Sequence, residues 1–312
     1  MKTTDMLGCV GGVSFLLLAS AWIPFFGPFL GLLIPLPFLY YSTKLGFYQG
    51  VKIAALATLI IGLVAGLIGH PQIVLLSVEL GALGLVLSEL FRRKLRAGQT
   101  IFFGTVFMLL LTLFFLFFMG LSKDMGPLEI MLDYLQSNLE AAIKTYKEMG
   151  VSQEDVVELQ ALAKAFMDGI SRFYPSIMII SAGFAVWLNF VMAKPLFWMG
   201  KLEYPDFGPL DRWQTPDYLI WGVILSGFAS LLSSGGIKLL AINALIVFSA
   251  VYLFHGISII LFFLNKYRVP PWIRISIYFI VFIQQLFLVV LVIAGVFDQW
   301  VDFRKIKRIT DS

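Results

Sequence analysis

The chain has 312 residues and a net charge of +4, and its composition differs strongly from that of soluble proteins. Hydrophobic residues make up 59% of the chain and charged residues 13%, whereas a soluble domain carries about 25% charged residues. Lipid must therefore replace water over most of the surface, which excludes a soluble fold. The few basic residues occur in short clusters and form no nucleic-acid-binding face.

Nine apolar segments approach or exceed the length of about 20 residues that a membrane-spanning helix needs. They cover residues 7–23, 28–43, 47–68, 72–91, 100–121, 174–196, 216–234, 237–265 and 272–297. The second segment holds Pro28, Pro35 and Pro37, so we expect it to be kinked or partly broken. The sequence therefore predicts an all-α, polytopic transmembrane bundle with about nine spans, or eight if one segment does not cross.

The basic clusters predict which loops face the cytoplasm, because Lys and Arg accumulate on that side. Residues 92–96 carry four basic side chains after the fourth span, which places this loop and the N-terminus inside. Nine spans would then put the basic tail at 304–308 outside, against the same rule. Either the rule fails at this tail, or one of the last three segments does not cross.

Residues 122–173 interrupt the series of spans with a polar insertion that carries nine acidic and five basic residues. Apolar residues recur in it at helical spacing on either side of Gly150, and Ser152 with Asp155 is typical of a helix start. We expect an amphipathic helical hairpin on the outer side, resting on the bilayer surface or on the mouth of the bundle. The chain then divides into residues 1–121, the hairpin at 122–173, and residues 174–312.

Glu79 lies near the middle of the fourth span, where a carboxylate costs about 2.5–3.5 kcal/mol on insertion scales. It must face the bundle interior or a wet cavity, either as a functional group or as a structural hydrogen-bond partner. His70 ends the third span and Asn189 lies in the sixth. We take Glu79, His70 and Asn189 as candidate substrate-binding residues, although interhelical hydrogen bonding is the simpler explanation for Asn189.

Gly8 and Gly12 lie four residues apart in the first span, a spacing that lets helices approach closely in lipid. This pair serves either packing within the protein or the docking of a partner. No enzyme or metal-site motif is present, and one cysteine with two histidines is a poor set of metal ligands. We therefore expect no catalytic residue, cofactor or metal, and we expect Cys9 to behave as a small apolar side chain.

Across nearly its whole length the chain resembles the YybS-like family of uncharacterised bacterial membrane proteins. The resemblance rests on the hydrophobic plan, the acidic insertion after the fifth span, and the segment Trp213-x-x-Pro216 before the seventh. It implies a multi-pass protein of the bacterial cytoplasmic (inner) membrane. It implies no catalytic residues.

The N-terminal part also resembles the S components of energy-coupling-factor vitamin transporters. The shared features are the proline-rich entry 24–28 into the second span, the basic end 92–94 of the fourth, and a six-span plan through residue 196. Small residues on the first helix of S components dock the coupling protein, which would assign Gly8 and Gly12 to partner docking. S components lack so large an insertion, and they end where three more spans begin here.

Two functions fit these features. The first is a small-molecule binding or transport-related protein with an S-component-like core, for which the partners are the lipid bilayer, a small-molecule ligand and a coupling or other membrane protein. The second is a non-transporting membrane scaffold or regulator that recruits protein partners through the hairpin or the glycine faces.

Overall fold

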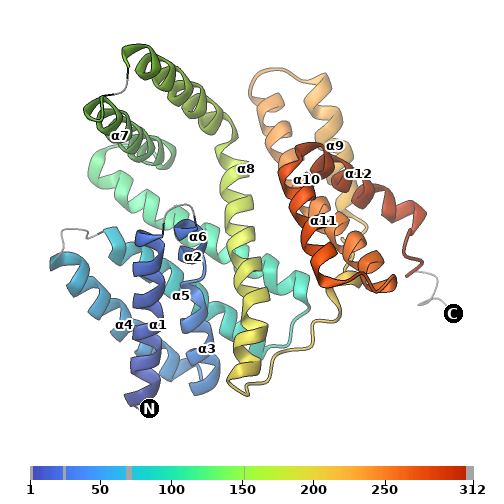
Figure 1. Ribbon diagram of the computed structural model, residues 1–312, viewed down its shortest axis with the longest axis horizontal. Coiled ribbons are helices and arrows are strands. Elements are labelled where there is room, and N and C mark those ends of the chain that lie inside the picture. The colour runs from blue at the N-terminus through green and yellow to red at the C-terminus, as the bar shows by residue number, and fades with distance from the viewer. Residues whose placement is uncertain (1–2, 24–25, 68–71, 151, 307–312) are drawn as a thin grey trace. The chain divides into compact units, whose positions relative to one another are not determined.

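The computed structural model describes residues 3–23, 26–67, 72–150 and 152–306, and these residues fold into helices without a strand. They form two compact units, an N-terminal unit, Met1–Asp206, and a C-terminal unit, Phe207–Ser312. The first carries helices α1 to α8 and the second α9 to α12, coloured blue to yellow and orange to red in Figure 1. The prediction of an all-α fold is confirmed for the described residues.

The N-terminal unit packs its apolar helices around a core that α1, α3, α4 and α5 share. Its elements are α1 (Thr3–Trp22), α2 (Gly27–Gly31), α3 (Pro35–Leu45), α4 (Phe47–Leu67), α5 (Gln72–Arg92), α6 (Ala97–Lys123), α7 (Pro127–Glu148) and α8 (Gln153–Met199). Cys9, Phe38 and Leu80 lie in this core. Cys9 is fully buried, as expected for a small apolar side chain.

The second predicted span is divided into two short helices, α2 and α3, by a turn at residues 32–34. Proline is the reason, because Pro35 has no N–H to continue a helix and fits the first turn of a new one. The backbone N–H of Leu36 would normally reach Leu32, but it donates to the Leu33 carbonyl at 3.0 Å. The Leu32 carbonyl therefore does not receive this backbone hydrogen bond and can accept one from a side chain.

The predicted hairpin is formed by α7 and the first part of α8, which lie side by side in green in Figure 1. Ser152 caps α8 by accepting a hydrogen bond from the N–H of Asp155 at 3.2 Å. Helix α8 then continues without a break through the predicted boundary at residue 173, with Pro175 and Pro195 inside it. The hairpin is therefore a direct extension of the sixth span.

The C-terminal unit is arranged around α10 (Gly235–Lys266), which packs against α9 (Leu219–Leu232), α12 (Gln285–Val301) and the 3-10 turn η1 (Leu210–Arg212). Helix α11 (Pro271–Ile283) precedes α12, and the two are bent by 99° at Gln284. Helices α10 and α12 approach closely because Gly256 and Gly295 lie at their crossing, where a Cβ on either would overlap backbone of the other helix.

Six helices among the described residues are long and apolar enough to cross a membrane: α1, α4, α5, α6, α8 and α10. The bent pair α11–α12 raises the number to seven if it counts as one span. The remaining predicted spans are shorter, since proline divides the second and α9 has 14 residues. Nine predicted segments thus correspond to six or seven helices of spanning length.

Candidate functional site

Glu79 is half-buried on α5 and accepts a hydrogen bond from the Thr112 hydroxyl of α6. The bond gives a membrane-level carboxylate one polar partner, and partners of this kind reduce the cost of placing it in apolar surroundings. Sequence reasoning did not identify Thr112, because helical spacing does not show which side chains meet across two helices. The expected interhelical role of Glu79 is present, and its role toward a substrate stays a prediction.

Asn189 is fully buried on α8 and holds the turn that divides the second span. Its Nδ2 donates to the Leu32 carbonyl at 2.7 Å and to the Ala185 carbonyl at 2.8 Å. The Oδ1 atom of the same amide is buried and has no hydrogen-bond partner among the described residues. A buried acceptor without a partner costs about 1–3 kcal/mol of stability. Asn189 Oδ1 is therefore free to accept a hydrogen bond from a bound molecule, and such a bond would recover part of this cost.

The structure does not bring the three candidate substrate-binding residues into one hydrogen-bonded group. Glu79 bonds to α6, whereas Asn189 bonds to the turn before α3 and to its own helix. Within the described ranges no hydrogen bond joins the two side chains. His70 lies outside the described residues.

Gly8 and Gly12 lie close to α3 and line an open groove of about 340 Å³ on the N-terminal unit. The groove is lined by Gly8, Gly12, Pro37, Tyr40, Tyr41, Leu196, Met199 and Gly200. A Cβ at Gly8 would overlap the Tyr41 hydroxyl, and one at Gly12 would lie 3.2 Å from Pro37 Cγ. The glycine pair thus contributes to packing within the unit, while the open groove leaves the docking of a partner as a prediction.

The glycine face allows a matched test on one helix. We expect Gly8→Ala to destabilise the protein by about 1–3 kcal/mol, because the new methyl group overpacks against Tyr41. A Cβ at Gly11 meets nothing within 4 Å, so Gly11→Ala should leave stability unchanged or raise it. Thermal unfolding of the two variants in detergent measures both. Equal unfolding midpoints for the two variants would contradict the packing of Gly8 against α3. If Gly8→Ala loses a protein partner while its midpoint is unchanged, the glycine serves docking.

A buried ionic cluster lies in the C-terminal unit, where sequence reasoning placed no site. It consists of Asp298 of α12, His255 of α10 and Arg304, which follows α12; their exposed fractions are 0%, 1% and 4%. Arg304 Nη2 donates to Asp298 Oδ2 at 2.9 Å, and His255 Nε2 lies 3.0 Å from the same oxygen. The Phe303 N–H donates to Asp298 Oδ1 at 2.8 Å, so both carboxylate oxygens have a partner.

His255 cannot satisfy all of its neighbours at once. Its Nε2 lies 2.8 Å from Arg304 Nη2, which only donates, and close to Asp298 Oδ2, which accepts. A single ring nitrogen serves one of these two contacts in any tautomer. Its Nδ1 is buried without a hydrogen-bond partner among the described residues. The hydrogen bonds of the cluster therefore centre on Asp298 and Arg304, and His255 Nδ1 has unused hydrogen-bonding capacity.

Sequence reasoning missed the cluster because His255 lies 43 and 49 positions from Asp298 and Arg304, so that no local pattern joins the three. His255 is a buried histidine whose Nε2 contacts the Asp298 carboxylate. Arg304 stands in the basic run at 304–308, and such a run does not show that one of its side chains is buried. The one available signal was Asp298, an acidic residue at the end of an otherwise apolar segment.

Comparisons with known proteins agree with a membrane protein. A family model described as "Predicted membrane protein (DUF2232)" matches residues 13–299. The "Uncharacterized protein YybS" of Bacillus subtilis (strain 168) is 22% identical over 291 residues, which cover 90% of each chain. No solved structure gives a significant match. The expected YybS-like resemblance is confirmed, and the likeness to S components stays a prediction.

Proposed function

Because the chain belongs to the DUF2232 family of predicted membrane proteins, we propose that it is a small-molecule binding or transport-related protein whose N-terminal unit handles the solute. The observation that carries this proposal is the turn at residues 32–34, with Asn189 holding the Leu32 carbonyl. Transporters commonly build their sites from interrupted membrane helices, whose unwound backbone offers polar groups at membrane depth. The proposal assigns no catalytic reaction.

The chemistry around this turn favours a solute that donates hydrogen bonds. Carbonyl groups of the turn and Asn189 Oδ1 are acceptors, and Oδ1 is buried without a partner among the described residues. Glu79 supplies a further acceptor on α5, in the same unit. We therefore expect a neutral or cationic solute that carries hydroxyl, amide or amino groups.

The proposal includes a location and a partner. The basic loop between α5 and α6 favours the cytoplasmic side, which places the N-terminus inside a bacterial cytoplasmic membrane. The groove beside Gly8 and Gly12 is the surface for a coupling or other membrane protein, as in the S components that the N-terminal part resembles.

Mass spectrometry of small molecules released from purified protein tests the solute site. We expect a compound to be retained by the wild type and lost about tenfold from Asn189→Ala, as one hydrogen-bonded contact of about 1.4 kcal/mol implies. Glu79→Gln should weaken retention as well. Asn243→Ala is the matched control, because Asn243 is a buried amide in the C-terminal unit. Retention that is the same in all four proteins would contradict the proposal.

One observation favours the alternative of a scaffold that recruits proteins. The hairpin carries an open apolar groove of about 280 Å³ between α7 and α8, and Leu162 on its edge is 60% exposed. If this groove recruits a partner, Leu162→Glu should abolish crosslinking to it, while Gln160→Glu adds the same charge on an exposed neighbouring position and should not. Crosslinking that both variants retain would remove the hairpin groove as a recruiting surface.

A further inference from the structure

The guanidinium group of Arg304 is enclosed by acceptors from three separate segments of the C-terminal unit. Its Nη1 donates to the carbonyls of Asp211 and Trp213, at 2.8 and 3.1 Å, and to the Ser258 hydroxyl at 2.8 Å. Its Nη2 donates to Asp298 Oδ2 at 2.9 Å. A carboxylate, a hydroxyl and two backbone carbonyls therefore surround one planar cation, and His255 Nε2 lies 2.8 Å from Nη2. Asp298 lies six positions before Arg304, whereas Ser258, Asp211 and Trp213 lie 46 to 93 positions away.

The hydrogen bonds to Arg304 involve its terminal nitrogens, Nη1 and Nη2, and not Nε. Both terminal nitrogens of Arg304 have acceptors, while its Nε–H is buried without a hydrogen-bond partner among the described residues. Nε is the nitrogen through which the guanidinium is attached to the chain. A free guanidinium ion would consequently make the same hydrogen bonds that Arg304 makes, because the attachment adds none.

The acceptors are held in place by other contacts than those to Arg304. Ser258 Oγ lies 2.8 Å from the Leu210 carbonyl and 3.0 Å from the Trp213 carbonyl, which ties the η1 turn to α10. Asn265 Nδ2 also donates to Asp211 Oδ2 at 2.8 Å. The turn that supplies the carbonyls is thus fixed to α10 independently of the tail, and such preorganised groups favour binding.

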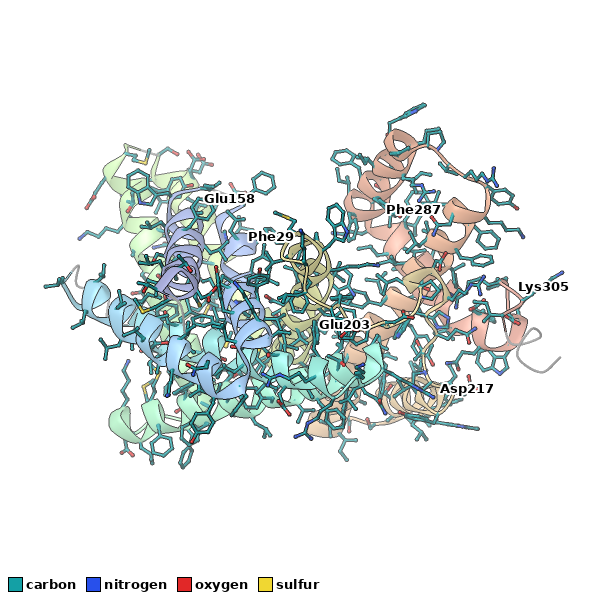
Figure 2. The ribbon with its side chains drawn as sticks, turned by 90° about the horizontal axis from the view of Figure 1, so that it is seen from below. Phe29, Glu158, Glu203, Asp217, Phe287 and Lys305 are labelled. Atoms are coloured by element: carbon teal, nitrogen blue, oxygen red, sulfur yellow. The ribbon has the colours of Figure 1, made fainter. Side chains whose placement is uncertain are left out.

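Two residues that flank Arg304 have left-handed backbone, and the first of them is the C-cap of α12. Asp302 and Lys305 have φ angles of 46° and 55°, in the left-handed region that side chains other than glycine rarely adopt. Lys305 is exposed, and Figure 2 shows it pointing away from the helices. Arg304 is thus the buried side chain of this segment, while the backbone N–H of Phe303 also donates to Asp298 Oδ1 at 2.8 Å.

We propose that the C-terminal unit contains a guanidinium-binding site, formed by Asp298, Ser258 and the carbonyls of Asp211 and Trp213, which Arg304 occupies as a tethered ligand. A free guanidinium ion or a small alkylguanidinium takes this site when residue 304 is vacated. In the wild type, the tethered Arg304 keeps a free ion of this class from the same acceptors. This site is separate from the solute site proposed for the N-terminal unit.

Thermal unfolding of full-length Arg304→Ala in detergent, titrated with millimolar guanidinium chloride, tests the proposal. We expect the ion to raise the unfolding midpoint of this variant by several degrees, since it binds the folded state alone. Methylguanidinium should act similarly. Sodium chloride and methylammonium chloride at the same concentrations should not, because a spherical or compact cation lacks the planar set of donors. The wild type and Lys305→Ala should not respond, because Arg304 fills their sites.

If Arg304→Ala does not fold alone, the yield of monodisperse protein purified with and without guanidinium gives the same answer. Recovery with guanidinium and not with methylammonium supports the site. The proposal is overturned if guanidinium stabilises Arg304→Ala no more than Lys305→Ala. It is likewise overturned if methylammonium is as effective, because the acceptors would then require only a positive charge.

Discussion

Asp298→Ala should destabilise the C-terminal unit by about 3–5 kcal/mol, the usual cost of removing one partner from a buried ion pair. The substitution would leave the Arg304 guanidinium, whose side chain is fully buried, without its carboxylate. It would also leave the Phe303 N–H without its acceptor. Chemical or thermal unfolding of the purified protein, followed by the fluorescence of tryptophans in this unit, measures the loss.

Two controls separate the buried pair from a general effect of charge. Asp217→Ala removes an exposed carboxylate before α9, labelled in Figure 2, and should cost at most about 1 kcal/mol. The double variant Asp298→Ala with Arg304→Ala should be less destabilised than the sum of the single variants, because it leaves no charge unpaired. Strictly additive losses would show that the two side chains do not interact.

The segment after α12 is expected to lie on the same membrane face as the loop between α10 and α11. Arg304 Nη1 donates to the Asp211 carbonyl at 2.8 Å, and Asn265 Nδ2 donates to Asp211 Oδ2 at 2.8 Å. Arg274 Nη1 in turn donates to Asn265 Oδ1 at 2.7 Å. Three consecutive hydrogen bonds thus join the two ends of the α11–α12 pair, too short a path to cross about 30 Å of hydrocarbon.

This arrangement predicts that α11 and α12 enter the membrane and return to the same face, which is compatible with the 99° bend between them. A re-entrant pair would also remove the conflict with the positive-inside rule, because it puts the basic residues at 304–308 on the same side as the basic loop after α10. Single cysteines at Arg268 and Lys305, in a Cys9→Ser background, should react together with an impermeant maleimide from one side. Glu148→Cys, on the hairpin, should react from the other side. If the cysteine at 305 reacts from the same side as the cysteine at 148, the re-entrant pair is contradicted.

The positions of the continuous, apolar helices could be predicted from the sequence alone. The predicted spans 47–68, 72–91 and 237–265 correspond closely to α4, α5 and α10, because length and apolar character decide such helices. Proline likewise predicted the interruption of the second span. The hairpin followed from helical periodicity, and Ser152 marked the start of its second helix as expected.

The remaining features depend on contacts that no local pattern records. The bend at Gln284 occurs without proline or glycine, in a run that is apolar on both sides. The cluster of His255, Asp298 and Arg304 joins residues up to 49 positions apart, and its formation depends on the close crossing of α10 and α12. Asn189 was identified as a candidate, but its bond to a carbonyl 157 positions away was not predictable from spacing.

A high-resolution structure of the protein purified in native lipid would test the proposed solute site most directly. We predict non-protein density within hydrogen-bonding distance of Asn189 Oδ1, beside the turn at residues 32–34, from a molecule that donates hydrogen bonds. A structure in which Asn189 Oδ1 accepts its hydrogen bond from a protein group, with only side chains packed around the turn, would contradict the account.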